Sequence, residues 1–179
     1  FMGPVNTRVV RRSAALVRGE PYAPDFRYQE YLRFGRGAAA ALAAAAASVA
    51  MASGPGALAF GPVRRLASAL APKPGQGPSE RVMDGGSFRC DLVGTGERGT
   101  VQRGRIADRG DPGNRATTKF VCESALALAL DGAALPGGAH LGGVLTPATA
   151  LGDVLARRLR AASMTVEPLP QKRVAIARG

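Results

Sequence analysis

An uncharged, alanine-rich stretch over residues 38–60 limits most strongly what the first part of the chain can fold into. It is as long as a bilayer-spanning helix of about 20 residues. However, it is mostly alanine, large apolar residues are few, and Gly54-Pro55-Gly56 interrupts it. We therefore expect a helix over about 38–52, a turn, and a short amphipathic helix over about 63–70. Docking of this segment to a membrane surface remains an open alternative.

A run of prolines and glycines over residues 72–79 predicts a loop between a helical part, 1–71, and a mixed part, 80–170. At 179 residues the chain is too short for a nucleotide-binding domain plus a second domain of ordinary size. We therefore expect a single domain over 1–170. Residues 171–179 are expected to form a flexible tail.

Two segments of the helical part have periodic apolar residues. Asn6 is expected to cap a helix that Gly19 and Pro21 end. The segment 26–34 alternates apolar and polar side chains, which predicts a half-buried strand with Glu30 as the polar exception on its apolar face. Its aromatic residues and arginines also fit a stacking platform for single-stranded nucleic acid. The alternation favours the core strand.

The mixed part is expected to combine strands with helices. Its elements are strands over 88–93 and 100–106, a helix over 115–131, a helix over 147–162 and a short strand over 165–167. The first two strands should form an antiparallel hairpin. The first helix has apolar residues on most of its faces, so we expect it to be buried. Thr146 is the expected N-cap of the second helix.

Residues 94–99 satisfy the G-x-G-x-x-G pattern of dinucleotide-binding proteins and follow an expected strand. A dinucleotide site also needs a helix directly after the glycines, because the pyrophosphate binds at the helix N-terminus. Here residues 100–106 follow, with strand-like alternation and a glycine in the middle. We therefore interpret the pattern as a hairpin turn without a cofactor.

The formal net charge of +11 raises the question of nucleic acid or an anionic membrane surface as a partner. Because the arginines are spread along the chain, we expect no nucleic-acid partner. A basic nucleic-acid-binding domain is the alternative, and salt would weaken its binding steeply. Cys90 and Cys122 lack the spacing of a zinc or redox pair, so we expect two buried, reduced cysteines and no metal site.

Three short motifs carry a resemblance to a known family. They are NTRVVRRS at residues 6–13, GDPG at 110–113 before a helix, and GGVLTPATA at 142–150 at the start of the last helix. Together they resemble the C-terminal portion of the saccharopine dehydrogenase-like oxidoreductases, in particular the trans-acting enoyl reductases. The resemblance extends from Asn6 to about Glu167.

This resemblance implies an α+β fold, with a mostly antiparallel or mixed sheet and helices packed against it. In the family, this portion closes over the nicotinamide of a cofactor held by an N-terminal Rossmann domain, which the chain lacks. The resemblance implies the substrate-binding part of an NAD(P)-dependent oxidoreductase that acts on lipid or acyl intermediates by hydride transfer. On its own, the chain would bind no cofactor and would be an inactive fragment.

The GDPG loop is the first candidate for substrate binding. In the family this loop faces the cleft between the two domains, which implies that Asp111, Gly113 and Asn114 line a cleft wall. Family members commonly have an aromatic residue where this chain has Asn114. As pure structure, the same loop is the start of a helix that Asp111 could cap.

The arginines of the first helix are the second candidate. Arg8, Arg11 and Arg12 share one stripe, and guanidinium groups bind carboxylate or phosphate in a bidentate manner. A solvated helix face is the alternative. The sequence identifies no catalytic residue. We expect a cytoplasmic protein, peripherally membrane-associated if residues 38–70 dock, and a non-catalytic lipid- or membrane-associated module is the alternative function.

Overall fold

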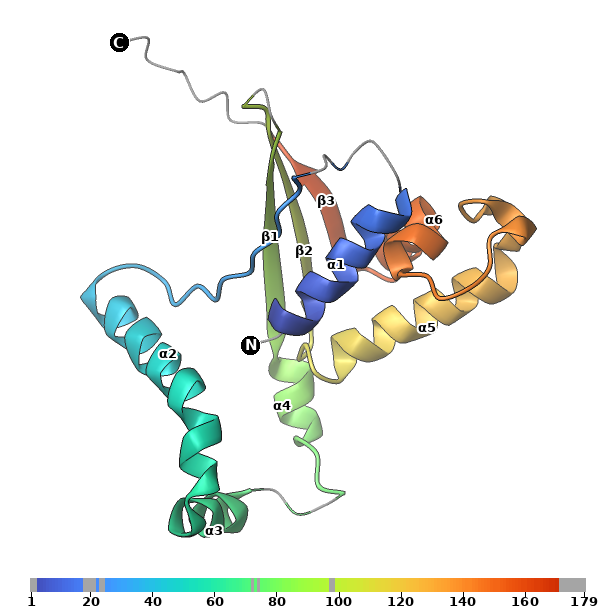
Figure 1. Cartoon of the computed structure of the whole chain (residues 1–179). Helices are drawn as coiled ribbons and strands as arrows, with labels where there is room; N and C mark the ends of the chain where they lie inside the picture. Colours follow the sequence, from blue (N-terminus) through green and yellow to red (C-terminus); the bar gives the residue numbers. More distant parts are fainter. Residues whose placement is uncertain are drawn as a thin grey trace, which may run out of the picture. The chain divides into compact units, whose positions relative to one another are not determined.

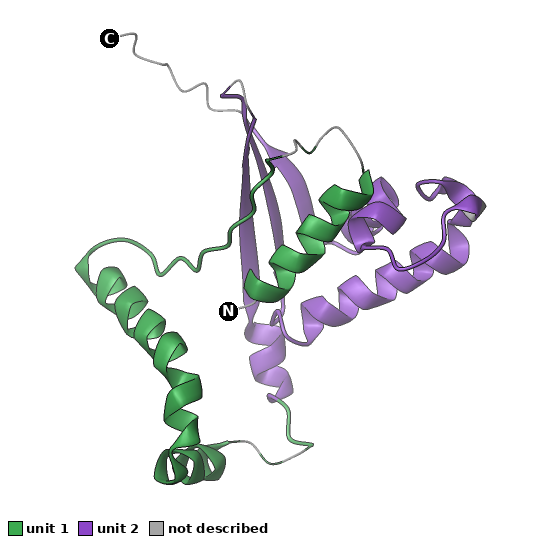
Figure 2. Cartoon of the chain, viewed as in Figure 1, with its two compact units in different colours: residues 1–77 green, residues 78–179 purple. Residues whose placement is uncertain are grey.

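The computed structural model describes most of the chain, in the ranges 3–17, 22, 25–71, 73, 75–96 and 99–170. These residues belong to two compact units, Phe1–Gly77 and Pro78–Gly179, which are coloured separately in Figure 2. The boundary falls inside the loop expected at 72–79. The single domain over 1–170 stays a prediction, and the expected tail lies outside the described residues.

Figure 1 shows the order of the elements. The described part of unit 1 contains the helices α1 (Gly3–Val17), α2 (Ala38–Ala59) and α3 (Gly61–Leu70). Unit 2 contains α4 (Glu80–Gly85), β1 (Ser87–Thr95), β2 (Val101–Arg109), α5 (Arg115–Leu130), the short 3-10 helices η1 (Gly132–Ala134) and η2 (Gly138–His140), α6 (Pro147–Ala161) and β3 (Thr165–Leu169). The expected α+β class is confirmed.

Helix α1 begins before the expected cap. It starts at Gly3, so Asn6 lies inside the helix and does not cap it. Instead, Asn6 Nδ2 donates a hydrogen bond to Glu30 Oε1 at 2.7 Å, and the Tyr28 hydroxyl donates to the same oxygen at 2.6 Å. Glu30 therefore ties the loop to α1. The stop signals expected at residues 19 and 21 lie outside the described residues.

Residues 26–34 form no strand, so this prediction was wrong. Tyr31, Leu32 and Phe34 are 83%, 62% and 42% exposed, respectively. A strand needs a neighbouring strand to satisfy its backbone groups. The described part of unit 1 is otherwise helical and offers none. Alternation of side chains is therefore not sufficient to make a strand here.

Helix α2 continues through the expected turn at residues 54–56 and ends only at Ala59. Proline restricts the residue before it by contact with that residue's Cβ, and Gly54 has no Cβ. Nothing lies within 4 Å of the Cβ positions of Gly54 or Gly56, so both glycines are in open space. The expected second helix is confirmed as α3, directly after α2.

The sheet of unit 2 is antiparallel throughout, in the order β1-β2-β3 (Figure 1). In the β1–β2 hairpin, Ser87 lies opposite Arg109 and Thr95 opposite Val101. The hairpin and the third strand are both confirmed. The G-x-G-x-x-G pattern begins inside β1, and β2 follows it where a dinucleotide site would need a helix.

Helices α5 and α6 pack against each other and form a small core. The buried residues of this core are Ala127, Leu151 and Val154, with Leu135, Ala150 and Leu155 packed on them. Between the two elements, Arg158 of α6 forms ion pairs with Glu123 at 3.3 Å and with Asp131. These contacts hold the helix pair together as a layer.

Helix α5 is not the buried helix that its composition indicated. Only Ala116 and Ala127 are buried, while Val121 and Leu130 are 62% and 69% exposed. α6 covers one stripe of α5 and leaves the rest uncovered. The two cysteines, expected to be buried, are also exposed: Cys122 lies on α5, and Cys90 lies on the edge strand β1.

Helix α6 has a defined start and a kink. Thr146 and Thr149 form a capping box, which confirms Thr146 as the N-cap. Gly152 interrupts the helix with φ 48° and ψ −132°. A Cβ at this position would lie 2.9 Å from Cγ of Pro136. Glycine is therefore required here both by the backbone conformation and by the space available.

Candidate functional site

An open depression lies at one end of the sheet in unit 2. It has a volume of about 690 Å³. Its lining residues come from the start of β1, the end of β2, the first half of α5 and the segment from the end of α6 to the start of β3: Ser87, Phe88, Ala107, Asp108, Arg109, Lys119, Ser163 and Thr165. This site could not be predicted from the sequence, because its residues come from four separate segments.

The charged centre of the depression is an ion pair between β2 and α5. Lys119 Nζ lies 2.5 Å from Asp108 Oδ2, and the side chain of Asp108 is only 7% exposed. Asp108 Oδ1 also accepts a hydrogen bond from the Arg109 backbone N–H at 2.9 Å. The Lys119 side chain is 28% exposed and so remains within reach of a bound anion or carbonyl.

The apolar wall of the depression is aromatic. The ring of Phe88 lies 6.2 Å from that of Phe120, centroid to centroid, in a tilted arrangement. This contact joins β1 to α5 beside Lys119. The depression therefore combines an apolar ring with a partly exposed ammonium group, a pairing suited to a ligand with an apolar chain and a polar head.

Ser163 lines the depression in a left-handed backbone conformation, with φ 65°. It is the only non-glycine residue with positive φ in the described part of the chain. The Ser163 N–H donates to the Arg160 carbonyl and the Met164 N–H to the Leu159 carbonyl, both at 2.9 Å. This is a Schellman ending of α6, in which glycine is the usual residue.

The loop of the GDPG motif follows directly on the depression, one residue after Arg109. The Asp111 carboxylate accepts hydrogen bonds from the Arg115 N–H and the Asn114 N–H, both at 3.0 Å. It also accepts one from Asn114 Nδ2 at 2.8 Å. The bond from the Arg115 backbone, followed by those from Asn114, lowers the pKa of Asp111 below its ordinary value. Asn114 is the N-cap residue of α5, and Asp111, three residues earlier, satisfies the N–H groups of Asn114 and Arg115 from outside the helix.

Close backbone approaches hold this loop in place. The Asp111 N–H donates to the Met83 carbonyl, and the Gly110 N–H to the Gly86 carbonyl, both at 2.7 Å. A Cβ on Gly113 would lie 3.3 Å from Asp111 Oδ2, so this glycine leaves room for the capping carboxylate. The structure thus brings Asp111, Gly113 and Asn114 together at the start of α5. Their role in substrate binding stays a prediction.

The second set of predicted site residues lies in unit 1. Arg8, Arg11 and Arg12 are all exposed on α1, as the stripe predicted. The buried side of this helix includes Ser13, which is 4% exposed. The arginines and the GDPG loop belong to different units. Substrate binding by the arginines also stays a prediction.

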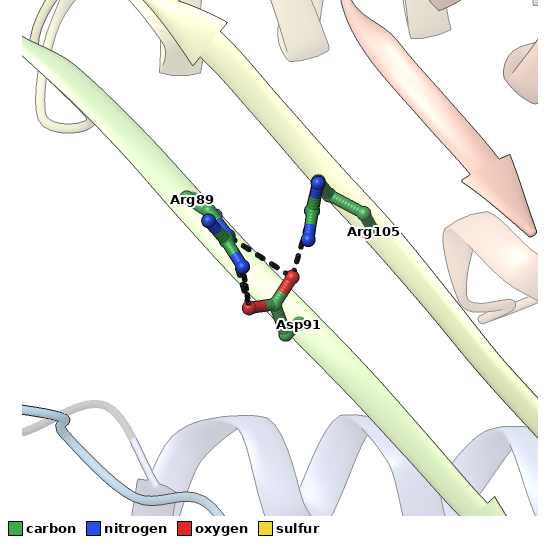
Figure 3. A network of polar contacts seen from close by, with 3 residues as sticks. All are labelled: Arg89, Asp91 and Arg105. Atoms are coloured by element: carbon green, nitrogen blue, oxygen red, sulfur yellow. Dashed lines mark hydrogen bonds and ion pairs between the residues drawn. The ribbon is translucent and has the colours of Figure 1, made fainter. Parts of the chain in front are cut away.

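An arginine network that the sequence analysis missed lies on the hairpin. Figure 3 shows Asp91 between Arg89 and Arg105. Arg89 Nη2 lies 2.6 Å from Asp91 Oδ2, and Arg105 Nε lies 2.8 Å from Asp91 Oδ1. Register explains the contact, because Asp91 and Arg105 are directly opposite each other across the two strands. Hydrogen bonds from Arg89 and then Arg105 lower the pKa of Asp91 to about 2.

The described residues do not fit a dinucleotide or a metal ion. In the only G-x-G-x-x-G match, Gly94 lies inside β1 opposite Gln102, so no helix N-terminus follows it to receive a pyrophosphate. The parts of the chain that the structure describes contain no group of three or more metal-ligating side chains.

No protein-family profile matches the chain, and no solved structure matches it. Relatives are found among mycobacterial proteins. The trans-acting enoyl reductase of Mycobacterium ulcerans is 40% identical over 161 residues, covering 88% of this chain and 37% of that protein. The trans-acting enoyl reductase of Mycobacterium bovis is 40% identical over 166 residues. The matched region covers 91% of this chain and 38% of that protein.

A protein of Mycobacterium tuberculosis that is provisionally named a trans-acting enoyl reductase is 38% identical over 175 residues. The matched region is 93% of this chain and 40% of that protein. The similarity to saccharopine dehydrogenases in general stays a prediction. The chain spans about two fifths of the length of these relatives, and over nearly its whole length it is homologous to part of proteins named trans-acting enoyl reductases.

Proposed function

We propose that this chain is the substrate-binding part of an enoyl reductase, an oxidoreductase that reduces a carbon–carbon double bond in an acyl intermediate. The observation that carries the proposal is identity of 38–40% to trans-acting enoyl reductases over 88–93% of the chain. The depression at the end of the sheet supports it, because a ring and a cationic group line the same space.

In this proposal, the depression holds the acyl group next to its activating carbonyl. Phe88 contacts the apolar chain, and Lys119 donates a hydrogen bond to the carbonyl oxygen. Asp108 keeps Lys119 in place through the 2.5 Å ion pair. The Ser163 hydroxyl is a further polar group at the rim. A hydrogen bond from a charged donor is worth about 1.5–3 kcal/mol, so Lys119 is the residue whose loss should weaken binding most.

The cofactor belongs elsewhere in this proposal. The hydride donor of an enoyl reduction is NAD(P)H, and the described residues of this chain do not fit it. We propose that a nucleotide-binding domain, in the part of the relatives that the chain does not span, holds the cofactor. The chain alone should then bind an acyl substrate without turning it over.

Isothermal titration with crotonyl coenzyme A, an enoyl thioester, tests the proposal on the whole 179-residue chain. We expect saturable binding, roughly 10- to 150-fold weaker for Lys119→Met and restored in part by Lys119→Arg. Arg157→Met, an exposed arginine on α6, is the matched control and should bind like the wild type. No saturable binding, or equal binding by Lys119→Met and the wild type, would contradict the proposal.

The arginine stripe on α1 can be tested in the same titration. Coenzyme A carries phosphates, which guanidinium groups bind in a bidentate manner. We propose that Arg8 and Arg11 form an anion site of unit 1 by itself, so Arg8→Gln/Arg11→Gln should weaken binding of a phosphate-bearing ligand such as coenzyme A but not of a short enoyl thioester that lacks phosphate. Equal losses with both ligands would speak against a phosphate contact.

A further inference from the structure

Helices α2 and α3 form an apolar surface that no described residue of unit 1 covers. None of the residues in either helix is buried. On α2, Leu42 and Val49 are 72% and 66% exposed; on α3, Leu66 and Leu70 are 62% and 78% exposed. Exposed apolar surfaces of this extent mark interaction sites in folded proteins.

Helix α2 has the length and composition of a helix inside a lipid bilayer. Among the described residues, it is the helix that could cross a membrane by these two criteria, and none of it is buried. At 22 residues it is about 33 Å long, compared with about 30 Å for a hydrocarbon core. It contains no charged residue on any face, which suits an apolar environment on all sides.

Helix α3 has the pattern of a helix that lies at a membrane surface. Val63, Leu66 and Leu70 fall on one side at helical spacing, and Arg64 and Arg65 lie on the other. Such a helix can bury its apolar side among acyl chains while its arginines contact lipid phosphates.

The charges around these helices all have the same sign. Residues 31–79 contain no aspartate or glutamate. The basic residues in that range are Arg33 and Arg36 before α2, Arg64 and Arg65 on α3, and Lys73 after it. Basic groups therefore flank the apolar stretch at both ends. This arrangement is complementary to a surface of anionic lipid headgroups.

We propose that unit 1 binds an anionic lipid bilayer through α2 and α3. In this arrangement α2 enters the hydrocarbon region, and α3 lies at the headgroups with Arg64 and Arg65 on phosphates. The inference is independent of the enoyl reductase proposal, because it concerns a different unit and a different ligand. It would place an enzyme that acts on acyl intermediates next to the membrane.

Vesicle flotation of the whole chain tests the proposal. We expect the protein to float with vesicles of phosphatidylcholine and phosphatidylglycerol, and much less with phosphatidylcholine alone. One basic residue near an anionic surface contributes about a factor of five to the partition coefficient. Arg64→Gln/Arg65→Gln should therefore bind anionic vesicles roughly 30-fold more weakly. The matched control is Arg81→Gln/Arg157→Gln, which removes two exposed charges from unit 2 and should bind like the wild type.

A tryptophan reporter gives an independent readout, because the chain contains no tryptophan. The tryptophan fluorescence of Leu66→Trp should shift to the blue on anionic vesicles. The control is Val144→Trp, at a position of unit 2 that is 85% exposed in the native chain, and its emission should not shift. The proposal is overturned if no vesicle floats the protein or if both double variants bind alike. It is also overturned if the chain self-associates in a way that protects Leu66→Trp from a soluble quencher without vesicles.

Discussion

A Cβ atom added at Gly86 would lie 2.9 Å from both the Cα and the backbone N of Asp111. The segment before β1 and the loop after β2 therefore touch backbone to backbone. Gly86 itself has φ −72° and ψ 170°, a conformation that any residue can adopt. The contact, and not the backbone conformation, is what requires glycine at this position.

Gly86→Ala should therefore destabilise unit 2 by about 1–3 kcal/mol, the usual range for overpacking a close contact. The neighbouring Gly85→Ala is the matched control, because nothing lies within 4 Å of its Cβ position. It should be neutral or slightly stabilising, since alanine favours the helix. Urea unfolding of both variants measures the difference. Equal unfolding free energies would show that the loop moves aside at no cost.

The left-handed conformation of Ser163 costs about 1–2 kcal/mol relative to a residue that prefers it. Glycine adopts this conformation without that cost, but it also makes the unfolded chain more flexible, which offsets part of the gain. Ser163→Gly should therefore raise the unfolding free energy by about 0.5–1 kcal/mol. Ser163→Ala removes the same hydroxyl but keeps the strain, and we expect no gain from it. If the two variants have the same thermal midpoint, the strain is not the cause.

The ion pair between Lys119 and Asp108 should show energetic coupling. Lys119→Met leaves the Asp108 carboxylate, 7% exposed, without its cation, at a cost of about 1–3 kcal/mol. Asp108→Asn/Lys119→Met should recover part of that loss, because no charge is left unpaired. A double-mutant cycle by chemical unfolding gives the coupling energy. Strictly additive effects would mean that solvent screens the pair.

Asp91 should make the stability of unit 2 sensitive to acid. Its pKa is lowered to about 2 in the folded protein, against about 3.9 when unfolded. Between these values the unfolded chain binds more protons, so acidification favours unfolding. The contribution of Asp91 is therefore present above pH ~4 and lost as the pH falls towards ~2.

Thermal unfolding between pH 5 and pH 2 checks this, with Asp91→Asn as the reference that cannot titrate. The wild type should unfold at a higher temperature than Asp91→Asn at pH 5, and this difference in midpoint should shrink as the pH falls to 2. Parallel curves for the two proteins would show that the arginines on either side of Asp91, 56% and 28% exposed, are too well solvated to matter.

Local patterns predicted the elements that local interactions determine. The β1–β2 hairpin followed from alternation on both sides of a glycine-rich turn. The start of α6 followed from Thr146, whose side chain and that of Thr149 satisfy each other's backbone N–H groups. The role of Asp111 at the start of α5 was identified for the same reason, since its partners lie three and four residues away.

The failures concern features that depend on distant neighbours. Residues 26–34 alternate like a strand, but the described part of unit 1 has no strand to pair with them. The apolar residues on most faces of α5 predicted burial, yet its neighbours leave much of the helix uncovered, and Val121 stays in solvent. The depression could not be predicted because Lys119 and Ser163 are brought together only by the packing of α5, α6 and the sheet.

The kink of α6 links two positions that lie sixteen residues apart. The ring of Pro136 occupies the space that any side chain at Gly152 would need. The stretch between them contains three glycines with positive φ, Gly137, Gly138 and Gly143. At Gly138 and Gly143 no neighbouring atom lies within 4 Å of the Cβ position, so space does not restrict the residue there. Among relatives, insertions and deletions should therefore collect around Gly138, before the GGVLTPATA motif and the capping box, while the proline and the glycine change only as a pair.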